Sequence, residues 1–221
     1  MEQLGIRTDV KCRCGVRPDA LGLHYLTCSA GKHLSARHEL CVRAYHEMAR
    51  ATGRYSEITG LEDRLNGFSG PGGHRLVLDQ TITDWTGDNA DVGIDYAVCH
   101  PCAPIYVAAA ATNSLSAATR RAEQKTGKYE AACRAHDMEF LPAIIEVFGA
   151  MNPTAVELIK RAARILQNEL PADSVRTWTA DNFAAFHSQR ISMALQRSNA
   201  KAIRLRAHRD LRDSGLSCIV T

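Results

Sequence analysis

The segment LDQTITDWTGDNADVGIDYAV, residues 78–98, contains two runs of strand-forming residues separated by a short polar stretch. RLVLDQTITDW (75–85) and DVGIDYAVCH (91–100) are rich in Val, Ile, Leu and Thr, and TGDN between them is typical of a turn. The pattern predicts two neighbouring strands joined as a hairpin. We expect the sheet of this protein to be built around that pair.

The flanking segments alternate between helical and strand patterns. Helices are predicted over 34–52, over 114–137 with a weak point at Gly127, from a capping box at Thr154–Glu157 to about Leu170, and over 181–213; further strands are predicted over 54–61 and 139–149. This order predicts an α/β fold with a mixed central β-sheet flanked by helices. We expect three parts: a cysteine–histidine knuckle at 1–33, a core at 34–172 and a basic helical C-terminal extension at 173–221.

The bulk composition is that of a globular protein. The chain has 221 residues, of which 45% are hydrophobic and 23% charged. No apolar run approaches the roughly 18–20 residues that span a bilayer, and the first residues lack the apolar core of a signal peptide. We therefore expect a soluble, intracellular protein whose eight cysteines are metal ligands or buried thiols rather than disulfides.

The opening segment holds five aspartates, and they fall into two groups. Asp84, Asp88 and Asp91 lie in or beside the predicted turn, where Asp is favoured for local hydrogen bonding. Asp79 and Asp95 are embedded in the two strands, so their carboxylates can meet at one end of the sheet. Two such carboxylates are typical ligands for Mg²⁺ or Mn²⁺ in phosphodiester cleavage.

The helix predicted after these strands has a lysine in its apolar stripe. The stripe consists of Leu115, Ala118, Ala122, position 125, Tyr129, Ala132 and Cys133, and position 125 is Lys125. A buried lysine is costly unless it is paired, and the Asp79/Asp95 cluster would pair it. The alternative is that Lys125 extends outward along Tyr129, in which case Lys128 is the substitute candidate.

The segment CRCGVRPDALGLHYLTC (12–28) predicts a metal site. Cys12, Cys14, His24 and Cys28 form a complete set of ligands for tetrahedral zinc of the structural kind. A set of buried free cysteines is the alternative, and His33, His38 or Cys41 could replace one ligand. Cys99-His100-Pro101-Cys102 also has metal-like spacing but lacks an evident fourth ligand.

The residues from 190 to 212 are basic. They include seven Lys or Arg and one acid, Asp210. A helix of this composition is either a phosphate-binding surface or an ordinary solvated face.

Several of these motifs, in this order, resemble those of a known family. C-x-C-G-x3-D-x2-G-x-H-x3-C is followed by ARH, by an Asp ending one strand, by a strand with ID-x-x-V, by K-x2-K-Y and by F-x-P-x3-E-x-F-G. From about residue 10 to 210, the chain resembles the C-terminal part of certain non-LTR retrotransposon polyproteins. That part joins a Cys-Cys-His-Cys knuckle to a restriction-like endonuclease of the PD-(D/E)XK superfamily.

The resemblance implies a role for each matching residue. Zinc would bind Cys12, Cys14, His24 and Cys28, and Asp79 and Asp95 would hold the catalytic Mg²⁺ or Mn²⁺. Lys125 would be the catalytic lysine, with Tyr129 on the same helical face. Glu57 would be the accessory acid, and Glu146 matches the acid of the late strand, with its role open. Two positions depart from the family pattern. Leu78 replaces the usual Pro, and Ala97 leaves no ordinary D-x-K, so the site depends on Lys125.

The expected function is that of a Mg²⁺-dependent DNA endonuclease domain of a retrotransposon-type protein. The resemblance implies a nuclear location, DNA and element RNA as partners, and a reverse transcriptase domain upstream. The alternative is a non-catalytic, zinc-containing nucleic-acid-binding module. A redox or metal-handling protein built on Cys99 and Cys102 is a third hypothesis.

Overall fold

A computed structural model describes residues 9–58, 73, 76–169 and 182–214. Within this part, four strands form one sheet in the order β1-β2-β3-β4: β1 (Ser56–Ile58), β2 (Gln80–Ile82), β3 (Asp91–Cys99) and β4 (Met138–Glu146). β2 runs antiparallel to both of its neighbours, β1 and β3. β3 and β4 run parallel over nine residue pairs, from Asp91↔Met138 to Cys99↔Glu146. The predicted mixed α/β sheet is confirmed.

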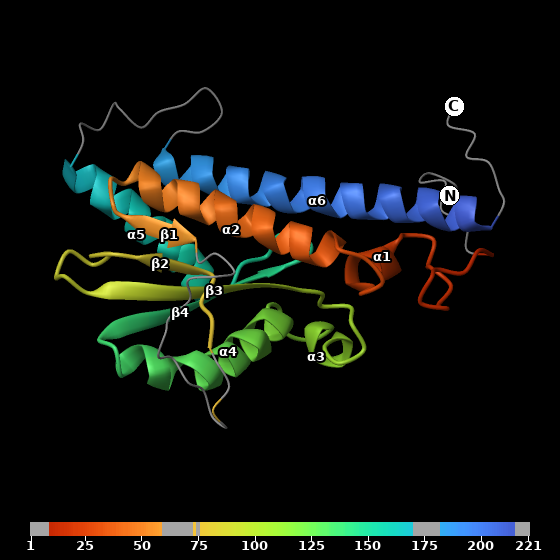
Figure 1. Ribbon diagram of the computed structural model, residues 1–221, viewed down its shortest axis with the longest axis horizontal. Coiled ribbons are helices and arrows are strands. Elements are labelled where there is room, and N and C mark those ends of the chain that lie inside the picture. The colour runs from red at the N-terminus through yellow and green to blue at the C-terminus, as the bar shows by residue number, and fades with distance from the viewer. Residues whose placement is uncertain (1–8, 59–72, 74–75, 170–181, 215–221) are drawn as a thin grey trace.

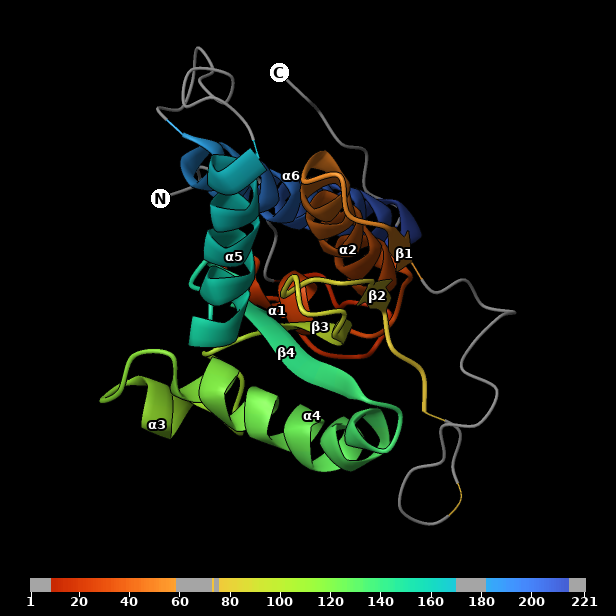
Figure 2. The same cartoon turned by 90° about the vertical axis from the view of Figure 1, so that its left-hand side faces the viewer.

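Helices cover both faces of the sheet (Figures 1 and 2). On one face lie α2 (His33–Ala51), α5 (Pro153–Glu169) and the long α6 (Phe183–Asp213). On the other lie α4 (Ser116–Arg134) and the short α3 (Val107–Ala110), which the sequence pattern did not predict. The small α1 (Leu23–Thr27) packs against the C-terminal half of α6.

Helices cover both faces of β3, and the side chains of this strand point alternately to the two faces, so every second one meets α4. Val92, Ile94 and Tyr96 enter the main core with residues of α2, α5 and α6. Ala97 and Cys99 instead pack with Ala117 and Ala118 of α4. Because successive side chains of a strand point to opposite faces, Asp95 lies on the α4 side.

The hairpin between β2 and β3 explains three of the five aspartates. The backbone N–H of Asn89 donates to Asp84, that of Asp84 to Asp91, and that of Ala90 to Asp88, with N···O distances of 2.8, 3.1 and 3.2 Å. These carboxylates therefore serve the turn, as predicted.

Two predicted strands are much shorter than expected. The strand predicted over 75–85 is only β2, because its pairing with β1 and β3 extends over three residues. Leu76 and Leu78 precede it without joining the ladder, and they pack against Tyr129 and Cys133 of α4. The strand predicted over 54–61 is reduced to β1 at residues 56–58, and residues 59–61 lie outside the described part.

The capping box predicted at Thr154–Glu157 is wrong. α5 begins one residue earlier, at Pro153, and Asn152 caps it by accepting a 3.0 Å hydrogen bond from the N–H of Ala155. The amide of Asn152 also bonds the backbone of Ile144 and Pro142, so it joins α5 to β4.

Membrane insertion was not expected from the sequence. Every helix in the described ranges is either too short or too polar to cross a bilayer.

Candidate functional site

Asp79 and Asp95 flank the last residue pair of the β2–β3 ladder. In the β2–β3 ladder Gln80 pairs with Ile94, and the N–H of Asp79 donates to the carbonyl of Ile94 at 2.9 Å. The ladder ends at this pair, with Asp79 directly before Gln80 on one segment and Asp95 directly after Ile94 on the other. The structure therefore places both aspartates at the same end of the β2–β3 ladder, near enough for the Asp79 carboxylate to raise the pKa of Asp95.

Asp79 also closes the end of the ladder. Its Oδ2 accepts the N–H of Tyr96 at 2.7 Å and lies 3.1 Å from Nε2 of His38 on α2. The same nitrogen of His38 is 3.2 Å from the carbonyl oxygen of Tyr96. Since both neighbours are acceptors, Nε2 carries the proton, and the bond to Asp79 raises the pKa of His38. Sequence reasoning treated His38 only as a substitute zinc ligand, whereas its partner is Asp79.

Asp95 forms an ion pair with Lys125. Asp95 is 3% exposed, and the side chain of Lys125 is 15% exposed. Burial raises the pKa of Asp95, the Asp79 carboxylate raises it further, and Lys125 opposes both effects. The lysine in the apolar stripe is thus paired, as its position in the stripe predicted.

Tyr129 lies one turn after Lys125 and completes this cluster. The ammonium of Lys125 is 5.7 Å from the centre of the Tyr129 ring. Burial and the nearby Asp95 carboxylate raise the pKa of the Tyr129 hydroxyl. Lys128 is exposed and contacts Tyr129 from the other side, with its Nζ 3.1 Å from the hydroxyl oxygen.

The two remaining acids lie elsewhere. Glu57 is exposed on β1, where it faces Thr81, two strands away from Asp95. Glu146 is buried at the end of β4 beside Cys99, and it accepts the N–H of Ala118 at 3.4 Å. Asp95 pairs with Pro142, so Glu146 lies four residues, or roughly 13 Å, further along the sheet. Neither acid joins the carboxylate pair.

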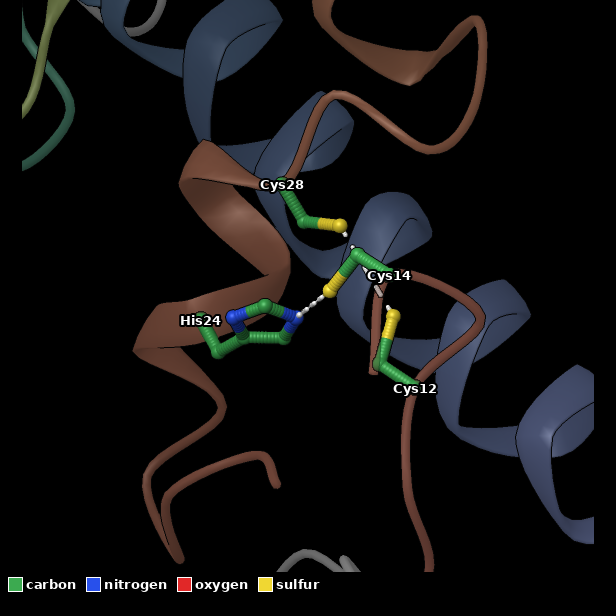
Figure 3. Close-up of side chains that lie close together, drawn as sticks. All are labelled: Cys12, Cys14, His24 and Cys28. Atoms are coloured by element: carbon green, nitrogen blue, oxygen red, sulfur yellow. Dashed lines mark hydrogen bonds between the residues drawn. The ribbon is translucent and has the colours of Figure 1, made fainter. Parts of the chain in front are cut away.

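The knuckle residues converge on one point (Figure 3). One ligand atom from each of Cys12, Cys14, His24 and Cys28 lies within 4.8 Å of all the others. The sulfurs of Cys12 and Cys28 are 3.7 Å apart, and Cys14 Sγ is 3.3 Å from His24 Nε2. Two sulfurs bound to one tetrahedral zinc are about 3.8 Å apart. The cluster could therefore hold a metal such as zinc, and within the described ranges it is the only group of three or more such ligands.

Local backbone features shape the knuckle. Gly15 follows Cys14 with φ 86°, which lets its N–H turn back to the carbonyl of Cys12 at 2.7 Å. Asp19 accepts the N–H groups of Leu23 and His24 at 3.0 and 2.8 Å, so it caps α1 and sets the direction of His24. The aspartate of the C-x-C-G-x3-D motif thus has a structural role.

Arg206 of α6 supports the knuckle, which sequence reasoning missed. Its Nη2 donates to the sulfurs of Cys12 at 2.7 Å and Cys28 at 3.2 Å, and its Nη1 donates to the carbonyl of Ala30. Arg206 is 3% exposed. In the sequence it was one of seven cations of a basic tail, and no local pattern distinguishes it from the others.

The basic stretch is consequently divided between two roles. Arg190 pairs with Glu47 and Arg206 is buried at the knuckle. Five exposed cations remain on α6: Arg197, Lys201, Arg204, Arg209 and Arg212. Most of them recur at three- or four-residue spacing, so they form a positively charged stripe along the helix.

Among the described residues, the second cysteine set gathers no further metal ligands. Cys99 is buried while Cys102 is exposed, and Nδ1 of His100 accepts the N–H of Cys102 at 3.0 Å. His100 therefore closes a local turn.

Comparison of the chain with protein-family models, with curated proteins and with solved structures gives no match. The resemblance to retrotransposon endonucleases accordingly stays a prediction.

Proposed function

We propose that the chain is a metal-dependent DNA endonuclease domain of a retrotransposon-type protein, with a core of the PD-(D/E)XK kind. The observation that carries this proposal is the arrangement of Asp79, Asp95 and Lys125. Two aspartates flank the last residue pair of the β2–β3 ladder, and a partly buried ammonium pairs with one of them. This is the set of charges that metal-assisted phosphodiester hydrolysis requires.

The donor chemistry of the pair fits a hard divalent cation. Carboxylate oxygens are the preferred protein ligands of Mg²⁺ and Mn²⁺, and Asp79 and Asp95 would hold the ion. Burial and, to a smaller extent, the Asp79 carboxylate raise the pKa of Asp95, and a divalent cation would favour its charged form. When bound, such an ion lowers the pKa of its water and acts as a Lewis acid on the phosphate.

The surrounding side chains then have defined tasks. Lys125 places a positive charge where negative charge develops on the phosphate as water attacks and the P–O bond to the leaving oxygen breaks. His38 donates to Asp79 and so fixes the direction of that carboxylate. Tyr129 lies beneath Lys125 and restricts its movement.

Substrate binding is assigned to the knuckle and to the exposed stripe of α6. The five cations of the stripe would contact phosphates, which confers affinity without reading sequence. Zinc at the knuckle would have a structural role, because all four ligand positions come from protein side chains. In this proposal the protein acts on nuclear DNA, together with the element's RNA and a reverse transcriptase domain.

A non-catalytic nucleic-acid-binding module is the alternative. It is favoured by one observation, namely that both carboxylates already have partners within the protein. Asp79 contacts His38 and the backbone of Tyr96, and Asp95 pairs with Lys125. Satisfied buried groups of this kind also occur as purely structural networks.

Nicking of supercoiled plasmid in Mg²⁺ or Mn²⁺ separates the two functions. The wild type is expected to nick, Asp95→Asn and Lys125→Met are expected to lose nicking, and Asp88→Asn in the hairpin loop serves as the matched control. Circular dichroism checks that each variant is folded. Equal nicking by the wild type and Asp95→Asn, or DNA binding without nicking by either, would contradict the catalytic assignment.

A further inference from the structure

A cavity of about 250 Å³ lies beyond the carboxylate pair, at the C-terminal end of β3. Its wall is formed by the last residues of β3, by α1 and the start of α2, and by Ala103, Tyr106 and Arg121. Figure 1 shows α1 and α3 on opposite sides of this end of the strand. The proposed chemistry does not use the cavity.

Arg37 of α2 brings a buried positive charge to this cavity. It is 4% exposed, and its Nη1 donates to Oδ1 of Asn199 at 3.1 Å. Its Nε has no hydrogen-bond partner, and no carboxylate of the described ranges forms an ion pair with it. Burial lowers the pKa of this guanidinium, which reflects the cost of keeping its charge away from water.

His100 contributes a second donor without an acceptor. It is 6% exposed, and burial together with the charge of Arg37 lowers its pKa, so the ring is neutral near pH 7. Because Nδ1 accepts the N–H of Cys102, the single ring proton lies on Nε2. That Nε2 is buried and has no partner among the described residues.

The third group is Arg121 of α4, which lines the same cavity. The acid whose charge acts on His100 is Asp19, and both of its oxygens accept N–H groups of α1. The charged side chains that line the cavity are thus two guanidinium groups, to which His100 adds an imidazole N–H. A ligand that matches them must be anionic and rich in acceptors.

The position of the cavity identifies the source of the anion. Ala97 lines it and lies two residues after Asp95 on the same face of β3, about 7 Å along the strand. Arg121 lies one turn before Lys125 on α4. A phosphate in the cavity would therefore lie next to one held at the carboxylate pair.

We propose that Arg37, His100 and Arg121 form an oxyanion pocket that receives a backbone phosphate of the bound nucleic acid, adjacent to the phosphate that is cleaved. This assignment rests on the proposed function, which it extends by naming a second point of contact with the same strand. The incoming phosphate would neutralise Arg37.

The test is equilibrium binding of a short DNA duplex in Ca²⁺, which does not depend on cleavage. Arg121→Gln and His100→Gln are compared with Arg134→Gln, an exposed cation at the far end of α4. The first two are expected to weaken binding about tenfold, with the slope of log affinity against log salt reduced by about 1, while Arg134→Gln behaves as the wild type. Because Arg37 is buried, Arg37→Met is added only if circular dichroism shows it folded.

A second experiment measures thermal stability in the presence of inorganic phosphate. The wild type is expected to gain stability that Arg121→Gln lacks. The assignment to a backbone phosphate would be overturned if free phosphate stabilised the wild type while Arg121→Gln bound the duplex as tightly as the wild type. It would also be overturned if Arg121→Gln matched the wild type in both duplex affinity and stabilisation by phosphate. Loss of duplex affinity in a protein that never nicks would leave the pocket standing while the nuclease proposal fails.

Discussion

Replacing Arg206 by methionine is expected to weaken zinc binding at the knuckle by about 10- to 100-fold. The methionine keeps an apolar stem of similar length but cannot donate to sulfur. The change therefore removes the hydrogen bonds to Cys12 and Cys28, at 2.7 and 3.2 Å, together with the bond to the carbonyl of Ala30.

The magnitude follows from these contacts. Hydrogen bonds with a charged partner contribute about 1.5–3 kcal/mol each, so two of them set an upper limit of about 3–6 kcal/mol. Without zinc these sulfurs can be thiols, which are weak acceptors, whereas they would bind zinc as thiolates, so the bonds from Arg206 would be stronger in the loaded state. A net loss of about 1.4–2.7 kcal/mol remains, which corresponds to the stated 10- to 100-fold.

The assay is competition between the protein and a chromophoric zinc chelator. Arg204→Met is the matched control, because Arg204 is an exposed arginine two residues away on the same helix. Arg206→Lys tests whether charge alone suffices, and it is expected to fall between the wild type and Arg206→Met. An affinity of Arg206→Met within about threefold of both the wild type and Arg204→Met would refute the reasoning.

Three further outcomes are expected. Zinc removal should raise hydrogen exchange in residues 203–213 and leave β3 protected, because the knuckle packs on Ile203 and Ala207 whereas β3 lies in the main core; equal loss of protection in both would contradict this. Burial lowers the pKa of His187 to about 4, so the unfolded state, with a pKa near 6.5, binds more protons between those values and stability falls as the pH drops. Urea unfolding should show a loss of roughly 2 kcal/mol from pH 7 to pH 5 that His187→Leu lacks; an equal pH dependence in both proteins would contradict it. Asn152→Ala should cost about 3 kcal/mol in the same assay, because it leaves backbone groups of Ile144, Pro142 and Ala155 without their partner; a cost below about 1 kcal/mol would contradict it.

The knuckle and the pairing of Lys125 could be predicted because each leaves a mark in the local sequence. Four ligands of the right type occur within 17 residues, from Cys12 to Cys28. A lysine within an apolar stripe interrupts the apolar face of the helix, and this interruption indicates that the lysine has a buried partner. The spacing of Asp79 and Asp95 on either side of a turn then supplied that partner.

The remaining features depend on contacts between distant segments. Nothing near His38 indicates that it bonds Asp79, which lies 41 residues away. Arg206 and Arg37 resemble surface cations in the sequence, and only the packing of α6 and α2 buries them. β2 is short because it pairs with β1 and with β3 over only three residues, and residue composition does not indicate where strand pairing ends.

The bond between Arg206 and Cys12 joins residues 194 positions apart, which has a consequence for the order of events during synthesis. The helix that shields the sulfurs of the metal ligands leaves the ribosome well after them, since Arg206 follows Cys12 by 194 residues. A nascent knuckle must therefore load its ion, or remain reduced, without that shield until α6 has been made. Closure of so long a loop is entropically slow, so docking of the knuckle onto α6 is expected to be a late step of folding.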